Sequence, residues 1–129
     1  MEKRLGKVLI VEDERHVARL LSFLLTRAGY QVAEAADGEE ALCMIDEFRP
    51  DGIVLDLILP KLSGVELLLA LDNHSKTFPI VIVTGCPDDE IPPEIARRSD
   101  IPRLGKPFIP DLLLRRLLDL NVTPLVDIT

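Results

Sequence analysis

The sequence predicts a single α/β domain built around a doubly wound parallel sheet, and three observations support that prediction. The chain has 129 residues, a normal length for one domain. Three short apolar runs, rich in β-branched side chains, indicate strands that are buried on both faces. These runs alternate with segments whose apolar residues recur at the helical period, and this alternation predicts parallel strands joined by right-handed crossovers.

Five strands are expected. The apolar runs at 8–11, 52–55 and 80–83 are the first, third and fourth strands. The second strand, at 31–35, and the fifth, at 103–106, are more weakly indicated because their apolar residues are fewer. The predicted domain spans residues 1–120, and residues 121–129 are expected to form a short C-terminal tail.

A helix is expected after each strand. Segment 14–28 places six apolar residues on one helical face, and Gly29 follows as a residue able to adopt the left-handed conformation that ends a helix. Two later helices begin with residue pairs that resemble a capping box, Asp37 with Glu40 and Ser63 with Glu66.

The last third of the chain departs from a regular pattern. Prolines at positions 87, 92, 93 and 102 predict a short fourth helix that begins near Pro92 or Pro93 and ends by Ser99. In the last helix, 110–120, leucines cover about 160° of the surface, wider than the roughly 100° stripe that core packing uses, and Leu112 lies outside this arc. Some of these leucines are therefore expected to contact a partner or a second copy of the chain.

Composition narrows the classes of function. A formal net charge of −7 argues against a nucleic-acid-binding surface, which needs clustered lysine and arginine. The N-terminus lacks the pattern of a signal peptide, and no apolar run approaches the roughly 20 residues that span a bilayer. Cys43 and Cys86 have no metal-like spacing and are expected to be ordinary small buried residues. A cytoplasmic domain without membrane contact is the prediction.

Charged and hydroxyl residues stand at the ends of the predicted strands. Glu12 and Asp13 end the first strand, Asp56 the third, Thr84 the fourth and Lys106 the fifth. In open α/β sheets, ligands bind beyond the carboxyl ends of the strands. The sequence therefore predicts that these five side chains meet in one crevice.

This set of side chains suits phosphoryl transfer. Three carboxylates in one crevice repel one another, and a divalent cation removes that penalty. Magnesium fits because it is a hard ion that prefers oxygen ligands. Asp56 would then attack a phosphoryl group, while the cation, the Lys106 ammonium and the Thr84 hydroxyl neutralise the charge on its oxygens.

Four segments of the chain resemble the response regulator receiver family of two-component signalling, and the similarity covers essentially the whole chain. The segments are VLIVEDE, VLDLILPKLSG, VTG and GKPF. The resemblance implies a flavodoxin-like sheet with strand order 2-1-3-4-5. It also implies that Asp56 accepts a phosphoryl group from a histidine kinase or a histidine phosphotransferase.

The resemblance further implies which residues form the site. Asp13 and Asp56 would bind Mg²⁺ together with the backbone carbonyl of Ile58, and Glu12 would act through a metal-bound water. The peptide bond Lys106–Pro107 would be cis. Such a chain is a switch rather than an enzyme, since it catalyses only its own phosphorylation and dephosphorylation. Its output would be altered contacts with a downstream protein. A homodimer through the last helix is expected from the leucines of that helix and not from the resemblance.

Alternative interpretations remain at this stage. Asp13 could serve only as the N-cap of the first helix, a position that aspartate favours. The chain could also be a pseudo-receiver that works by protein contact without phosphorylation. A phosphatase of the haloacid-dehalogenase type would have a second acid two residues after the nucleophile, where this chain has Ile58. No nucleotide-binding loop of the form G-x-x-x-x-G-K-[ST] is present.

One position departs from the family pattern. Receivers usually carry an aromatic residue on the fifth strand, three positions before the lysine, and its rotation reports phosphorylation. Here that position is Arg103, which is expected to point to solvent. The usual coupling between the threonine and the aromatic ring therefore cannot operate in its ordinary form.

Overall fold

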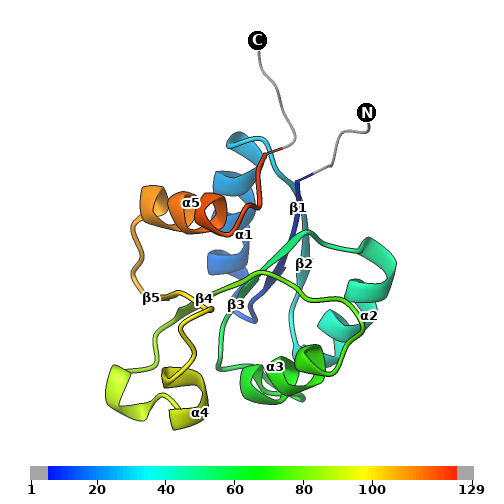
Figure 1. Ribbon diagram of the computed structural model, residues 1–129. Coiled ribbons are helices and arrows are strands. Elements are labelled where there is room, and N and C mark those ends of the chain that lie inside the picture. The colour runs from blue at the N-terminus through cyan, green and yellow to red at the C-terminus, as the bar shows by residue number, and fades with distance from the viewer. Residues whose placement is uncertain (1–5, 125–129) are drawn as a thin grey trace.

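The computed structural model describes residues 6–124, which form a five-stranded sheet with helices on both faces (Figure 1). All strand pairs are parallel and the order is β2-β1-β3-β4-β5, as predicted. Both weakly indicated strands are present, although the fifth is only three residues long. The strands are β1 (Lys7–Val11), β2 (Gln31–Ala35), β3 (Gly52–Leu55), β4 (Ile80–Thr84) and β5 (Arg103–Gly105).

Two helices cover one face of the sheet and three cover the other (Figure 1). The first pair is α1 (Arg15–Arg27) and α5 (Pro110–Asp119). The opposite face carries α2 (Gly38–Phe48), α3 (Gly64–Asp72) and the very short α4 (Pro93–Ala96), which follows the 3-10 turn η1 (Asp88–Glu90). The short fourth helix confirms the effect expected from the prolines, with Pro93 in its first turn.

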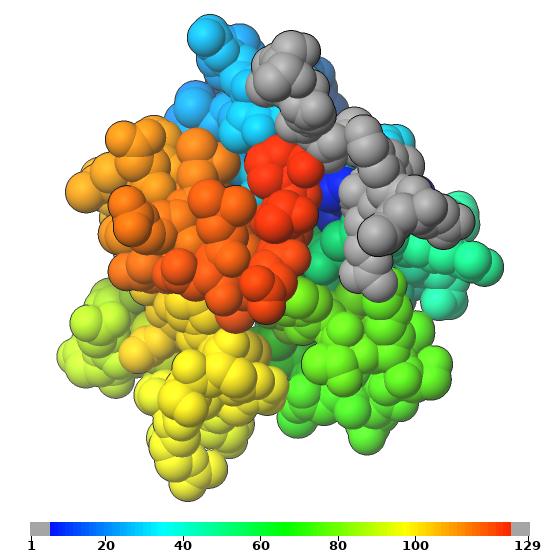
Figure 2. Space-filling view, turned by 45° about the horizontal axis from the view of Figure 1, so that its top comes forward, coloured from blue at the N-terminus to red at the C-terminus, as the bar shows by residue number. Residues whose placement is uncertain are grey.

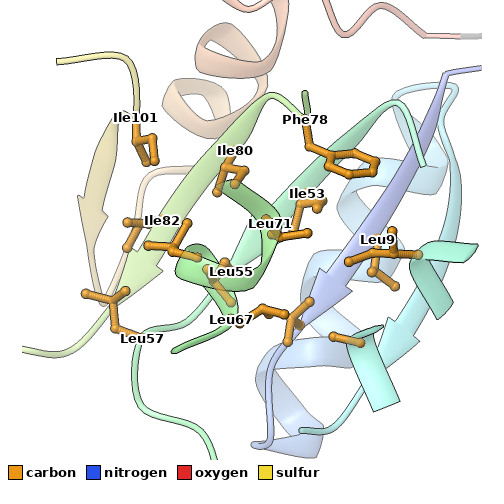
Figure 3. Close-up of a cluster of buried hydrophobic side chains, with 14 of the residues drawn as sticks. Leu9, Ile53, Leu55, Leu57, Leu67, Leu71, Phe78, Ile80, Ile82 and Ile101 are labelled. Carbon is orange, nitrogen blue, oxygen red and sulfur yellow. The ribbon is translucent and has the colours of Figure 1, made fainter. Parts of the chain in front are cut away.

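The three central strands, β1, β3 and β4, are buried on both faces because alternate residues belong to two separate cores. Leu9, Ile53 and Ile82 face α2 and α3, and Figure 3 shows this cluster. Val8 and Val54 face α1 and α5 in the second cluster. The two-sided burial explains why the strand sequences are continuous apolar runs instead of alternating polar and apolar residues.

The expected helix-boundary features are largely confirmed. Gly29 has a φ of 100°. Ser63 and Glu66 form a complete capping box. At the start of α2 the Asp37 side chain accepts a hydrogen bond from the Glu40 amide as expected, but the Glu40 carboxylate accepts from the amide of Ala36 instead of that of Asp37.

The leucine-rich helix α5 divides into a buried and an open side. Leu113 and Leu117 are buried, whereas Leu118 is 49% exposed. The residues after α5 fold back onto the domain, shown in red in Figure 2. Val122, in the segment expected to be a tail, is buried, and its carbonyl accepts a 2.5 Å hydrogen bond from the Tyr30 hydroxyl. The domain boundary at residue 120 stays a prediction, and 125–129 lie outside the described residues.

The two cysteines differ in exposure. The prediction that Cys43 is buried is wrong, because its position on α2 faces solvent, whereas Cys86 is half-buried. Among residues 6–124, none of the helices has the length and apolar character needed to cross a membrane.

Candidate functional site

Buried polarity is concentrated at one edge of the sheet. Within residues 6–124, the buried polar or charged side chains are Glu12, Asp56 and Thr84. Glu12 directly follows β1, Asp56 directly follows β3, and Thr84 is the last residue of β4. Because parallel strands share a carboxyl edge, these three residues are brought together although the sequence separates them. Burying such groups is unfavourable unless partners compensate for the lost water.

Lys106 supplies that compensation. Its backbone amide donates to the Thr84 carbonyl at 2.9 Å, which fixes the start of the loop after β5. Its ammonium lies 2.7 Å from Oε1 of Glu12 and 2.9 Å from Oδ2 of Asp56. The Lys106–Pro107 bond is cis, as expected. One ammonium therefore links the ends of β1 and β3 to the end of β5.

The charge states of this cluster follow from burial and hydrogen bonding. Burial raises the pKa of Glu12, and the neighbouring Asp56 acts in the same direction, against the lowering effect of Lys106. Burial alone would lower the pKa of Lys106, but its hydrogen bonds to Glu12 and Asp56 outweigh burial and raise it. The ammonium stays charged as a result.

Three carboxylates converge closely enough to hold a metal ion. One oxygen from each of Glu12, Asp13 and Asp56 lies within 4.8 Å of the others, and Asp13 is exposed. Hard oxygen donors with an open side suit Mg²⁺, which usually keeps several waters. Asp13 is not the N-cap of α1, because Glu14 occupies that position, so the N-cap interpretation of Asp13 is wrong.

The loop after Asp56 is held tightly. The Ile58 amide donates to Oδ1 of Asp56 at 3.1 Å, while the Ile58 side chain is 61% exposed. Gly64 begins α3 against this loop, and a Cβ added there would lie 2.5 Å from Cα of Leu57 and 2.7 Å from the Asp56 carbonyl oxygen. Only glycine allows this approach. The carbonyl of Ile58 stays a predicted metal ligand.

The segment after β4 is looser. Thr84 Oγ1 accepts a 3.2 Å hydrogen bond from the Cys86 amide, which leaves its hydroxyl hydrogen free to donate to another group. A Cβ added to the intervening Gly85 would meet no atom within 4 Å. Arg103, the residue in place of the usual aromatic, is exposed, as expected.

Sequence analysis missed one acidic residue at the site. Oε1 of Glu14 lies 3.7 Å from the Lys106 ammonium, farther than Glu12 and Asp56 but still within ion-pair range. Its position directly after the acidic pair was a sequence signal for this proximity. The five residues that were predicted to meet do lie together at the edge.

Comparisons with known proteins agree with this architecture. Residues 8–118 match the family model described as the response regulator receiver domain. The chain is 37% identical over 123 residues to the probable transcriptional regulator ycf27 of Cyanophora paradoxa, covering 91% of this chain and 48% of that protein. It is 35% identical over 113 residues to the response regulator MprA of Mycolicibacterium vanbaalenii, covering 86% and 48%. The chain thus spans about half the length of these relatives.

Solved structures show the same similarity. The chemotaxis response regulator CheY4 of Vibrio cholerae has a TM-score of 0.77 and 33% identity, covering 90% of this chain and 98% of that one. The receiver domain of the Francisella response regulator 1452 has a TM-score of 0.76 and 29% identity, covering 88% and 94%. The chain belongs to the response regulator receiver domain family of two-component systems.

Proposed function

We propose that this receiver accepts a phosphoryl group on Asp56 from a phosphohistidine of a histidine kinase or histidine phosphotransferase, in a Mg²⁺-dependent reaction. The observation that carries the proposal is the Asp56 carboxylate itself. It is buried at the end of an apolar strand, 2.9 Å from the ammonium of Lys106. A buried carboxylate of this kind is a candidate functional group because burial and charge partners govern its reactivity.

The donor set fits the cation. Asp13 and Asp56 would hold Mg²⁺ directly, with the Ile58 carbonyl as a third ligand and Glu12 acting through water. The close approach of the three carboxylates supports this assignment. When bound, the ion supplies positive charge that offsets the repulsion among the carboxylates and the phosphoryl oxygens.

The transfer step is a displacement at phosphorus. An Asp56 oxygen forms the new P–O bond while the P–N bond of the donor breaks, and the imidazole nitrogen keeps the electron pair of that bond. Lys106 donates to one phosphoryl oxygen and the Thr84 hydroxyl to another, which neutralises charge on the transferring group. The chain acts on its own carboxylate, so we class it as a switch and not as an enzyme.

A shallow apolar groove beside the site suits the donor protein. It has a volume of about 210 Å³ and is lined by Val17, Leu20, Lys106, Pro107, Phe108 and Pro110. An amphipathic helix carrying the phosphohistidine could place its apolar side in this groove. Lys106 connects the groove to the acceptor, because it lines the groove and its ammonium lies 2.9 Å from Oδ2 of Asp56.

The output is proposed to be a change in protein contacts in the cytoplasm. The open side of α5, including Leu118, offers an apolar surface for a downstream protein or for a homodimer. The acidic net charge makes direct nucleic-acid binding by this domain unfavourable.

The proposal is tested by intact-mass spectrometry after incubation with acetyl phosphate and Mg²⁺. We expect one phosphoryl group on the wild type, none on Asp56→Asn, and none on the wild type in EDTA. Asp119→Asn, an exposed aspartate on α5, is the matched control and should be phosphorylated like the wild type. Equal uptake by Asp56→Asn would refute the assignment, and no uptake by any form would favour the pseudo-receiver.

A further inference from the structure

Glu14 lies at the solvent-exposed side of the site, and it is an N-cap residue whose side chain does not cap its helix. It is the N-cap residue of α1, with extended backbone angles of φ −78° and ψ 112°, but its side chain makes no capping hydrogen bond. The N-caps of α2 and α3, Asp37 and Ser63, do make such bonds. The Glu14 carboxylate instead lies 3.7 Å from the Lys106 ammonium.

The local backbone favours this direction. The amide of Glu14 donates to Oε2 of Glu12 at 3.1 Å, which ties the turn between β1 and α1 to the buried carboxylate. The Glu14 side chain is 65% exposed, whereas that of Glu12 is 2% exposed. Glu14 is thus the carboxylate partner of Lys106 that is in contact with solvent, where a phosphodonor must enter.

We propose that Glu14 determines phosphodonor specificity by charge: it disfavours dianionic donors relative to donors that carry less negative charge. This inference rests on the proposed function of Asp56. An incoming phosphoryl oxygen must approach Lys106. Of the three carboxylate contacts of that ammonium, the one to the exposed Glu14 is the longest, so it is the contact that gives way. Glu14 remains beside the entering phosphoryl group, and its repulsion grows with the charge of the donor.

The other carboxylates at this edge are not expected to repel the donor in the same way. Glu12, Asp13 and Asp56 belong to the cluster whose oxygens lie close enough to share a cation, which offsets their charge. Glu14 lies outside that cluster. Among residues 6–124 its printed ion-pair partner is Lys106, which the buried Glu12 and Asp56 already engage at shorter distances.

The test compares initial rates of Asp56 phosphorylation by acetyl phosphate, a dianion, and phosphoramidate, a monoanion, at saturating Mg²⁺. In each case the P–O bond to Asp56 forms while the donor bond breaks, and acetate or ammonia leaves with the electron pair. Glu14→Gln removes the charge with little change of shape. Glu94→Gln, an exposed glutamate in the first turn of α4, is the matched control.

We expect Glu14→Gln to accelerate phosphorylation by acetyl phosphate about three- to tenfold at low ionic strength, with a smaller gain for phosphoramidate. The difference between the donors should shrink in about 1 M salt, where the screening length falls to roughly 3 Å. Glu14→Asp keeps the charge and should retain the discrimination of the wild type. A purely structural role of Glu14 would alter neither the donor ratio nor its dependence on salt.

Two outcomes would contradict these expectations. An unchanged donor ratio in Glu14→Gln, or an equal gain with both donors, refutes the role of Glu14 and leaves the proposed function intact. A wild type that takes up no phosphate from either donor refutes the proposed function and this inference with it.

Discussion

The ends of β1 and β3 hold buried charge in fixed geometry, whereas the segment that follows β4 has little regular structure and is anchored in the core by Ile91, Ile95 and Ile101. Glu12 and Asp56 are almost completely buried and share one ammonium. After Thr84, η1 has no buried residue and α4 is a single turn, and Figure 1 shows this segment at the lower edge of the domain. The difference suggests that one part of the edge is built for chemistry and the other for rearrangement.

The two parts are also expected to differ in local stability. A fixed carboxylate needs a rigid surrounding, because small displacements weaken phosphoryl transfer. Elements with few buried contacts open at low free energy and are suited to conformational change. Variants placed in each part should therefore behave differently.

Lys106→Met should destabilise the fold most. The change leaves Glu12 and Asp56 buried without their ammonium, and removing one partner of a buried ion pair costs about 3 kcal/mol of unfolding free energy. Urea unfolding followed by circular dichroism in EDTA measures the loss, and added Mg²⁺ should restore part of it. The control Lys61→Met alters an exposed lysine and should change stability by less than about 1 kcal/mol. Unaltered stability of Lys106→Met in EDTA would contradict the buried-charge interpretation.

Gly64→Ala and Gly85→Ala compare the two parts directly. A methyl group at Gly64 would overlap Leu57 and the Asp56 carbonyl, whereas one at Gly85 meets open space. We expect a loss of about 2 kcal/mol for Gly64→Ala, with slower phosphorylation, from such overpacking. Gly85→Ala should stay within about 0.5 kcal/mol of the wild type. Equal losses in the two variants would show that the loop after β3 is no tighter than the segment after β4.

Arg98→Ala tests how much ion pairs stabilise the residues between α4 and β5. Arg98 forms ion pairs with Asp72 on α3 and with Asp100 before β5. Both pairs are partly exposed, so we expect a loss below about 1 kcal/mol at neutral pH.

The free energy that Arg98 contributes to stability should depend on pH. Hydrogen bonding to Arg98 lowers the pKa of Asp100 in the folded state, so the pair stabilises the protein above the ordinary aspartate pKa and the contribution disappears as pH falls through the lowered value. The difference between Arg98→Ala and the wild type should therefore narrow in acid. A constant difference between pH 7 and pH 3 would argue against the ion pairs as its cause.

Activation should change amide exchange in residues 85–102 more than in β1 and β3. With Mg²⁺ and beryllofluoride, an acyl-phosphate mimic, we expect a severalfold change in exchange over 85–102, together with altered self-association or partner binding through α5. The reason is that Thr84 is expected to move toward the phosphoryl oxygens, and the regular structure of the segment after it consists of the 3-10 turn η1 and the single turn α4. Unchanged exchange there and an unchanged oligomeric state would contradict this assignment of the output.

The sequence was sufficient to predict the sheet and the proximity of the five site residues, because both follow from general properties of parallel sheets. Two-sided burial requires apolar strands, and parallel strands must present Asp56, Thr84 and Lys106 at one edge. The proline positions were enough to predict the length of α4. These features depend on backbone geometry more than on individual side-chain contacts.

Three local features were not predicted from the sequence. Sequence alone could not decide whether Asp13 or Glu14 caps α1, since a one-residue shift of the helix start changes the answer. It also missed the burial of Val122, whose apolar side chain follows the last helix without any periodic pattern. The exposure of Cys43 was missed because cysteine is usually buried.

Reductive trapping identifies the residue that carries the phosphoryl group, which we propose is Asp56. Borohydride converts an acyl phosphate to an alcohol, which marks the modified residue for tandem mass spectrometry after proteolysis. For the wild type treated with acetyl phosphate and Mg²⁺, we predict the mark at Asp56 alone. A mark at Asp13, Glu12 or Glu14, or phosphorylated protein without a mark at Asp56, would contradict the assignment.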